Sequence, residues 1–433
     1  MITRIVTIVF FVISSVSIIA FARGYRLDIA NSTLTSTGLV SVASVPRSAK
    51  VYVNGELKGI TDLNLNLSPG EYVFTVSKEG YFPWQKKVKI RGEIVQSLAA
   101  TLYPITSSLT PLTNIGIAKA VPLGTQSDKV ILFSSKKSLL VDTPVPSSSE
   151  AELVGSEAGI YIYDAGRRMV SLLPNLQKII SYTDIDPEVA PNDLEFILAP
   201  DGKQMAVFVL DPNRANPTPS VHHTEYYPKY EVPTTYLKAV LVNIDDSNVG
   251  PLNITDTVES LIDAWTQQKE KQLLTLTGSL EKPLGAFIKN NTRILDISPD
   301  KTKVLYEATA TATLQPILAT PLIGSNQTEE FRTLEKKQVY VYDIKEDRNY
   351  LVSDKKSNVR NRIIFHPNSK NLVFDEGKSI NIADFDGLNK QKVYSGPFDT
   401  LFFAMVSDGR LLILTNLNPE LNVYGDLYAI GIL

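Results

Sequence analysis

The feature that most constrains the fold of this chain is a short two-strand pattern that recurs along it. One copy reads ILDISPDKTKVLYEA at Ile294–Ala308, where two apolar runs flank the polar turn Ser-Pro-Asp-Lys. Further copies begin at Phe196, Ile363 and Met405, and a fainter one begins at Thr125. Apolar runs bounded by turn residues predict strands. Each copy therefore predicts a hairpin, and the repetition predicts one supersecondary unit arranged around an axis.

Several copies continue into two further predicted strands. A third strand ends in Asp and a turn, as in GIYIYDAGRR at Gly159–Arg168, and a fourth follows, as in MVSLL at Met169–Leu173. Four strands per repeat are typical of a β-propeller blade. We expect residues 105–433 to form a propeller of about five to seven blades, with six favoured. The C-terminal DLYAIGIL at Asp426–Leu433 is expected to close the ring beside a strand from Ile105–Leu112.

The polar turn of each copy carries an acidic or amide residue. Aligning the copies places Asp128, Asp201, Asp300, Asn368 and Asp408 at this position. Asp and Asn side chains accept hydrogen bonds from backbone N–H groups two residues further along, and Pro presets φ for such turns. We therefore predict that Asp201, Asp300, Asn368 and Asp408 shape turns and bind no ligand.

The uneven spacing of these turns predicts insertions at 211–235, 248–292 and 309–337. The first contains the string HHTEYYPKYEVP, whose candidate partner-binding residues are His222, His223, Tyr226, Tyr227 and Tyr230. Imidazoles and the nearby Glu225 are metal-ligand types, but adjacent side chains on an extended backbone point to opposite sides. We predict no metal and no cofactor. The segment is expected to be either an exposed aromatic contact loop or a cap over the propeller.

The other two insertions carry different signals. The second contains a predicted helix at Asp256–Gln272, with an apolar stripe at helical spacing. The stripe consists of Val258, Leu261, Ile262 and Trp265. It is expected to pack on a blade or, alternatively, to dock a partner. The third insertion is rich in Thr and Pro and is expected to be an exposed loop, in which Arg332 and Glu329-Glu330 are solvated charges.

The N-terminal region is organised differently from the repeats. Ile5–Ala22 is an uncharged apolar run near the lower length limit for a membrane-spanning helix. We expect residues 1–24 to be a single-pass membrane anchor, residues 25–37 a tether, and the bulk of the chain extracytoplasmic. A cleaved signal peptide ending near Ala22 and a buried soluble helix are the alternatives. A cytoplasmic-facing propeller also stays open, because arginines flank the run on both sides.

Residues 38–104 predict a compact all-β unit. Asn54-Gly55 is a strong hairpin signal, and the alternation of apolar and polar residues along Tyr72–Val76 predicts a strand with one buried face. Lys87, Lys89 and Arg91 alternate with apolar residues on another strand. This alternation predicts a solvated basic face or, alternatively, attraction to anionic lipid or cell-wall polymer.

A resemblance rests on these strands and turns. The Pro-Glu-Gly-Ala signature of the PEGA domain, a small β-sandwich module of bacterial and archaeal surface proteins, falls on Pro46–Ala49 with two of four residues changed. Gly55 matches the family's turn glycine, and Gly59–Asp62 matches its Gly-x-Thr-Pro without the proline. Pro69–Tyr72 and Gly80-Tyr81 match its later turns. The region thus resembles a PEGA domain, which implies an extracytoplasmic module without catalytic residues.

The repeated turns carry a second resemblance. As a set they resemble the WD40-like Pro-Asp repeats of Tol-type periplasmic propellers, although His366-Pro367-Asn368 lacks the aspartate and the copy at Thr125 lacks the proline. As a whole, the chain resembles PEGA-containing membrane proteins of candidate-phyla bacteria. That resemblance implies an architecture and a localisation in the cell membrane, and no more.

Composition and motifs narrow the function. The net charge of −3 gives no drive toward nucleic acid, and the absence of cysteine excludes disulfides and thiolate sites. There is no serine-hydrolase elbow, zinc-protease motif or phosphate-binding glycine loop. We therefore expect a non-enzymatic binding or scaffolding protein of the cell envelope, which presents its propeller to a protein or cell-wall polymer. A propeller-type hydrolase acting on glycans or peptides is the alternative, because carboxylate pairs form in space rather than in sequence.

Overall fold

The structure is a computed structural model. It describes residues 2–22, 25–28, 33–124, 127–134, 159–175, 194–211, 230, 232–244, 250–278, 280, 282–354, 362–400, 402–420 and 422–432.

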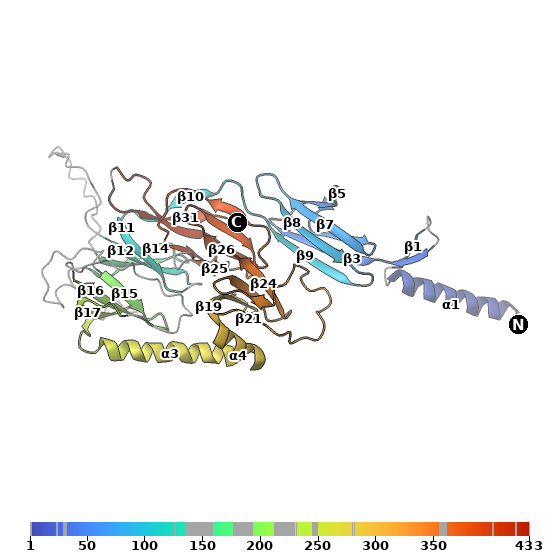
Figure 1. Cartoon of the computed structure of the whole chain (residues 1–433). Coiled ribbons are helices and arrows are strands. Elements are labelled where there is room, and N and C mark those ends of the chain that lie inside the picture. Colours follow the sequence, from blue (N-terminus) through green and yellow to red (C-terminus); the bar gives the residue numbers. More distant parts are fainter. Residues whose placement is uncertain are drawn as a thin grey trace, which may run out of the picture. The chain divides into compact units, whose positions relative to one another are not determined.

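The chain divides into two compact units (Figure 1). The first unit comprises Met1–Thr106 together with Leu318–Glu329. The second unit comprises Ser107–Ile317 together with Glu330–Ile432. The segment Leu318–Glu329 therefore belongs with the first unit, although residues of the second unit precede and follow it in sequence.

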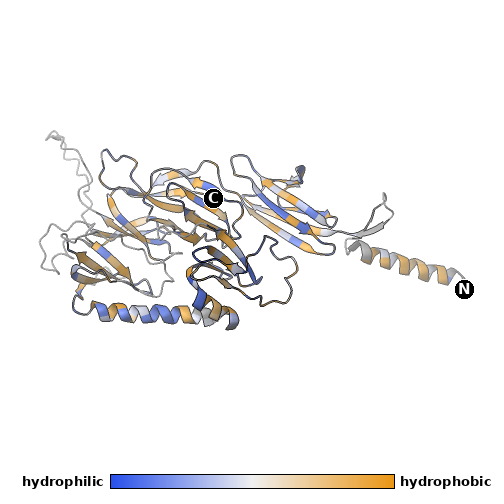
Figure 2. Ribbon diagram, viewed as in Figure 1, coloured by the Kyte–Doolittle hydropathy of each residue, from blue (hydrophilic) through white to orange (hydrophobic). Residues whose placement is uncertain are grey.

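The first unit begins with helix α1 (Ile2–Ala22), followed by the paired strands β1 (Tyr25–Asp28) and β2 (Thr33–Ser36). Figure 2 shows α1 as a mostly hydrophobic helix. Within the described ranges, no helix combines the length and the apolar character that a membrane crossing requires. This finding corrects the membrane-spanning anchor predicted at residues 1–24. The predicted tether at 25–37 contains the β1–β2 pair.

The rest of the first unit is a two-sheet sandwich. Its strands are β3 (Gly38–Val45), β4 (Lys50–Val53), β5 (Glu56–Ile60), β6 (Leu63–Leu67), β7 (Gly70–Ser77), β8 (Trp84–Ile90) and β9 (Val95–Thr101). One sheet has the order β5-β4-β7-β8 and the other β6-β3-β9. Val42, Phe74 and Val88 belong to the buried core between them. Asn54 and Gly55 both have positive φ, as the hairpin signal predicted.

The second unit contains five antiparallel four-stranded sheets within the described residues. Sheet 1 is β11 (Ile117–Pro122), β12 (Lys129–Ser134), β13 (Gly159–Asp164) and β14 (Met169–Asn175). Sheet 2 is β15 (Leu194–Leu198), β16 (Gln204–Leu210), β17 (Tyr236–Asn243) and β18 (Leu252–Asn253). Sheet 3 is β19 (Thr292–Ile297), β20 (Lys303–Ala308), β23 (Val339–Asp343) and β24 (Arg348–Ser353). Sheet 4 is β25 (Ile363–Phe365), β26 (Asn371–Asp375), β27 (Ile380–Asp384) and β28 (Gln391–Tyr394).

Sheet 5 is formed by both ends of the second unit. Its order is β29 (Phe403–Met405), β30 (Leu411–Thr415), β31 (Asp426–Gly431) and β10 (Ser108–Pro111). Strand β10 pairs antiparallel with β31, from Ser108↔Gly431 to Pro111↔Tyr428. The two ends of the unit therefore close one sheet together, as the sequence predicted for Asp426–Leu433.

Apolar clusters join these sheets face to face. Ile131 of sheet 1 packs in one cluster with Val207 of sheet 2, and Leu132 of sheet 1 packs in another with Leu412 of sheet 5. A further cluster joins sheets 3 and 4 through residues that include Leu305 and Leu372. Sheets 4 and 5 meet where the Arg362 guanidinium donates to the Phe403 carbonyl oxygen at 2.6 Å. Four of the sheet–sheet junctions of a propeller-type ring are thus present.

Helices occupy the fifth junction, between sheets 2 and 3. Helix α3 (Val258–Gly278) packs Ile262 and Trp265 on the face of sheet 2 that is opposite to sheet 1. Helix α4 (Lys282–Asn291) packs Leu284 and Ile288 on the face of sheet 3 that is opposite to sheet 4. The helices contact each other, and α4 lies at the C-terminal end of α3 in Figure 1. The described residues thus give five sheets and a helix pair, not the six blades favoured from sequence.

The predicted helical stripe explains why a helix can take this place. Val258, Ile262 and Trp265 are all buried, and they recur on one side of α3. Burying Trp and Ile in this way contributes about 2 kcal/mol per side chain. The prediction that the stripe packs on a blade is confirmed for sheet 2. Helix α4 was not predicted, because Pro283 and Gly285 weaken its helical pattern.

The antiparallel pairing separates the connections into two groups. The turns that join first to second and third to fourth strands leave from one end of the sheets, which we call the short-turn end. The connections that join second to third strands, and each sheet to the next, leave from the other, long-connection end. Because each meander alternates direction, the predicted insertions at 211–235 and 309–337 depart from the long-connection end. The one at 248–292 begins in the β17–β18 connection at the short-turn end, and its helices follow β18 at the long-connection end.

Candidate functional site

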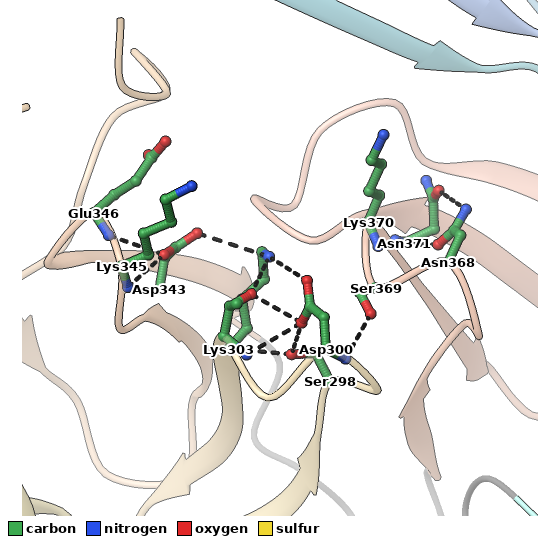
Figure 3. Close-up of polar contacts among 11 residues, drawn as sticks. Ser298, Asp300, Lys303, Asp343, Lys345, Glu346, Asn368, Ser369, Lys370 and Asn371 are labelled. Carbon is green, nitrogen blue, oxygen red and sulfur yellow. Dashed lines mark hydrogen bonds and ion pairs between the residues drawn. The ribbon is translucent and has the colours of Figure 1, made fainter. Parts of the chain in front are cut away.

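The short-turn end carries the repeated Asp and Asn residues, and Figure 3 shows two of its turns. Asp300 Oδ1 accepts from Thr302 N at 3.1 Å, from Thr302 Oγ1 at 2.8 Å and from Ser298 Oγ at 2.6 Å. Burial alone would raise the pKa of Asp300, but these hydrogen bonds and the Lys303 charge lower it. The carboxylate is therefore held inside its own turn.

The other turns repeat this geometry. Asp201 accepts from Lys203 N at 3.0 Å, Asn368 from Lys370 N at 2.9 Å and Asp408 from Arg410 N at 3.1 Å. Each bond spans two residues, as expected of an Asx turn. These side chains therefore stabilise their own turns. In Figure 3, Lys345 and Lys370 extend away from the network, and both residues are exposed.

Asp128 departs from this pattern. The turn bond beside it is made by Ser127, whose Oγ accepts from Lys129 N at 3.1 Å. Asp128 instead accepts from Ser407 N at 2.7 Å and from Ser407 Oγ at 2.6 Å, which joins sheet 1 to sheet 5. The sequence alignment assigned the turn position of this copy to Asp128, whereas Ser127, one residue earlier, makes the turn bond.

A buried aspartate that sequence reasoning missed makes a second tie between sheets. Asp296 lies in β19, is fully buried, and accepts from Ile297 N at 2.8 Å and from Phe365 N of sheet 4 at 2.7 Å. A buried carboxylate needs hydrogen-bond donors to offset the loss of water, and two backbone N–H groups donate to Asp296. The signal in the sequence was a charge in the middle of the apolar run ILDI.

At the long-connection end, most of the candidate contact loop cannot be placed. His222, His223, Tyr226 and Tyr227 lie outside the described residues. Tyr230 is described and is buried, with its ring centroid 6.4 Å from that of Trp265. The Lys269 ammonium lies 4.3 Å from the Tyr230 ring centroid. Tyr230 is thus a core residue under α3 and cannot contact a partner at the surface, which corrects its assignment to an exposed loop.

Charged residues line up where the first strands of the sheets begin, at the long-connection end. Lys119 of β11 lies over the Phe196 ring of β15, with Nζ 4.8 Å from the centroid. Burial lowers the pKa of Lys119, and the charges of Glu195 and Asp399 oppose that shift. Arg293 of β19 pairs with Glu307.

The third insertion is held more firmly than expected. Arg332 pairs with Asp347 at 3.0 Å and with Glu330 at 3.3 Å. Asp347 also accepts from Tyr342 Oη at 2.7 Å and from Ile317 N at 2.7 Å. Arg332 was predicted to be a solvated charge, and the structure corrects this: the pair with buried Asp347 fastens both ends of the insertion to sheet 3.

The remaining ionisable groups show no shared site. Burial raises the pKa values of Asp375 and Asp426, yet Asp375 accepts from Gly377 N and Asp426 from Ile115 N, in different sheets. Burial lowers the pKa of His366 to about 4, and its Nδ1 accepts from Asn368 N at 3.1 Å. In the parts of the chain that can be placed, no group of three His, Cys, Asp or Glu residues is arranged for a metal.

Comparison with known proteins identifies the first unit. Residues 37–106 match the PEGA domain family, in agreement with the resemblance noted in the turns of residues 38–104. No curated protein matches the chain.

Solved propeller structures resemble the chain at low identity. TolB from Acinetobacter baumannii is 9% identical over 83% of this chain, with a TM-score of 0.20, and the match spans 60% of TolB. The tricorn protease is 10% identical over 75% of this chain, with a TM-score of 0.26, and the match spans 26% of it. The β-propeller domain of the Trilobed protease from Pyrococcus furiosus is 10% identical over 94% of this chain, at a TM-score of 0.20 and 88% coverage. Residues 37–106 thus match a PEGA domain, and the second unit consists of the four-stranded antiparallel sheets described above.

Proposed function

We propose that this protein is a non-catalytic binding or scaffolding protein of the cell envelope. It presents the long-connection end of its second unit to a protein or cell-wall polymer, outside the cytoplasm. The observation that carries this proposal is the contrast between the two ends of the sheets. At the short-turn end the repeated side chains satisfy backbone groups, whereas at the other end long connections of unrelated sequence depart from the same edge.

The placement of the insertions supports a binding role, because scaffolds of repeated strands carry their specificity in loops. The connections at 135–158, 176–193, 211–235 and 309–338 all leave from the long-connection end. The charges of Lys119 and Glu195 lie at the same end of the first strands. A partner that bound there would meet both the variable connections and the mixed charges of Lys119 and Glu195.

The test shortens one insertion without removing core residues. Residues 212–228 would be replaced by Gly-Ser-Gly, which leaves buried Tyr230 and the β16–β17 pairing in place. The full chain and the shortened chain would then capture envelope proteins and isolated cell wall. We expect the shortened chain to lose at least about tenfold in affinity for the captured component. Equal capture at equal thermal stability would contradict a role for this loop.

Localisation needs a separate measurement. Protease added to intact cells is expected to degrade the second unit if it lies outside the cytoplasm. Cleavage only after lysis would contradict that part of the proposal. The hydrolytic alternative predicts release of soluble glycan or peptide from purified cell wall by the full chain, and such release would replace the binding proposal with an enzymatic one.

A further inference from the structure

The segment Leu318–Glu329 is fixed against the edge of the PEGA domain. The side-chain amide of Gln327 bonds the backbone of Lys89 in both directions: Lys89 N donates to Oε1 at 2.8 Å and Nε2 donates to Lys89 O at 3.0 Å. Gln96 Nε2 donates to Gly324 O at 3.2 Å. Strand β8 is the edge of its sheet. Gln327 therefore pairs with backbone groups of β8 that a neighbouring strand would otherwise bond.

A tight turn in this segment presents apolar side chains to solvent. Ser325 N donates to Leu322 O at 3.2 Å, and Gly324 has φ +76, as a type II turn requires. Ile323 at the corner of this turn is 82% exposed and Leu322 is 44% exposed, whereas Ser325 is buried. The turn is therefore anchored on one side and apolar on the other.

A third apolar side chain belongs to the same place. The Val95 carbonyl oxygen lies 3.2 Å from the position of a Cβ on Gly324, and the Val95 side chain is 61% exposed. We call Leu322, Ile323 and Val95 the apolar tip. Scattered exposed apolar residues are ordinary on protein surfaces. Two of them on a hydrogen-bonded turn, with a third on the neighbouring strand, are less so, and residues 318–328 carry no charge.

Basic side chains flank the apolar tip. Lys87 and Lys89 lie exposed on β8, and Arg91 follows them in the turn to β9. Lys89 is the residue whose backbone Gln327 holds. The acids near these cations are Glu93, in the same turn, Glu329, two residues after Gln327, and Glu71, which pairs with Lys87 at 2.7 Å. Lys89 and Arg91 are thus the exposed cations on and directly after the strand that this segment contacts through Gln327.

We propose that the apolar tip and the basic residues beside it form a docking surface for an anionic lipid membrane. Ile323 and Leu322 would enter the boundary between headgroups and acyl chains, while Lys89 and Arg91 would meet the headgroup charge. A soluble polyanion would engage the cations but leave Ile323 in water. The combination of apolar and cationic groups is what favours lipid. This surface lies in the first unit and is independent of the partner proposed for the second.

The test uses the absence of cysteine from the chain. Ile323→Cys in the full chain provides one labelling site for an environment-sensitive NBD fluorophore. Leu252→Cys, at a residue of β18 that is 61% exposed, provides a matched site in the second unit. Vesicles of phosphatidylcholine alone and of phosphatidylcholine with phosphatidylglycerol are then added. Reading the probe at a single position separates this surface from lipid contact by α1.

We expect a blue shift and a several-fold rise in emission at position 323 with anionic vesicles, and little change at position 252. Lys89→Glu together with Arg91→Glu should raise the vesicle concentration needed for half of the change by roughly tenfold or more. No change at position 323 would overturn the proposal, as would equal changes at both positions or with neutral vesicles. Binding to a soluble polyanion without a blue shift would also overturn it, because the tip would then remain in water.

Discussion

The two ends of the sheets in the second unit are built on different principles. At the short-turn end, an Asp or Asn recurs and makes the same turn bond in four copies, at Asp201, Asp300, Asn368 and Asp408. At the long-connection end, each connection has its own length and its own solution. One connection folds into the helices α3 and α4, and another runs from this end to the β23–β24 turn, where Arg332 pairs with Asp347. The repeated turn residues thus serve the fold, and the connections that differ between sheets are where a specific function can lie.

The connection between sheets 2 and 3 shows that the long-connection end also carries stability. Helices α3 and α4 cover the two sheet faces that would otherwise need another sheet. A long connection is therefore part of the core where its side chains are buried, as in α3 and α4, and a surface element where they are exposed. The predictions below are ordered from the largest expected effect to the smallest, and each tests one side of this contrast.

The largest effect is expected for Trp265→Ala. Trp265 is 6% exposed between α3 and sheet 2, and truncating a buried aromatic side chain costs about 3–5 kcal/mol. Urea unfolding at pH 7 measures the change in unfolding free energy. Gln268→Ala on the exposed side of the same helix is the control, with an expected change of about 0.5 kcal/mol or less. A loss below about 1 kcal/mol for Trp265→Ala would show that the helices do not replace a sheet.

A smaller effect is expected for Asp296→Ala, about 3 kcal/mol. The substitution leaves the buried N–H groups of Ile297 and Phe365 without their charged acceptor, and bonds to charged groups are worth about 1.5–3 kcal/mol each. Asp201→Ala is the matched control, because it removes one exposed turn bond worth about 1 kcal/mol. Equal losses of unfolding free energy in the two variants would mean that the Asp296 bonds between sheets 3 and 4 stabilise the fold no more than one turn bond does.

The pH dependence of His366 predicts an intermediate effect. The folded-state pKa is lowered from 6.5 to about 4, so at pH below 6.5 the unfolded chain takes up a proton that the folded chain does not. The contribution of His366 is thus fully present above pH 6.5 and is lost as the pH falls from 6.5 toward 4. It amounts to about 2 kcal/mol between pH 7 and pH 5.

Unfolding curves recorded at several pH values measure this loss. His366→Asn keeps an acceptor for Asn368 N but does not titrate, and it should flatten the curve between pH 7 and pH 5 by that amount. An unchanged slope in this variant would place the acid sensitivity elsewhere.

The smallest effect is expected for Gln327→Ala, about 1 kcal/mol, since it removes two hydrogen bonds at the exposed edge of β8. Amide hydrogen exchange at Lys89 is the more specific readout, because its N–H loses an acceptor. Gln268→Ala again serves as the control. Unchanged exchange at Lys89 would show that Leu318–Glu329 does not protect this edge.

Sequence patterns predicted the hairpins well because turn chemistry is local. Asp300 and Thr302 are close in the chain, so their bond is fixed by short-range geometry. The same holds for Asn54-Gly55 and for the helical stripe around Trp265. Closure of sheet 5 by β10 could be predicted because an unpaired edge strand remained at each end of the unit.

Other features depend on residues far apart in sequence, and no local pattern reports them. Asp296 meets Phe365, and Gln327 meets Lys89, only after the chain has folded. Six blades were favoured from sequence, whereas the described residues give five four-stranded sheets, with a helix pair between sheets 2 and 3. Arg332 looked solvated because its partner Asp347 lies beyond an intervening strand.

The most direct test of the contrast between the two ends compares paired charge reversals in the full chain. Lys336→Glu with Lys378→Glu changes exposed lysines at the long-connection end, and Lys345→Glu with Lys370→Glu changes exposed lysines at the short-turn end. Affinity for the captured envelope component is measured for both variants at equal thermal stability. We expect a loss of about tenfold or more for the first pair and less than about twofold for the second. A larger loss for the second pair would contradict the assignment of binding to the long-connection end.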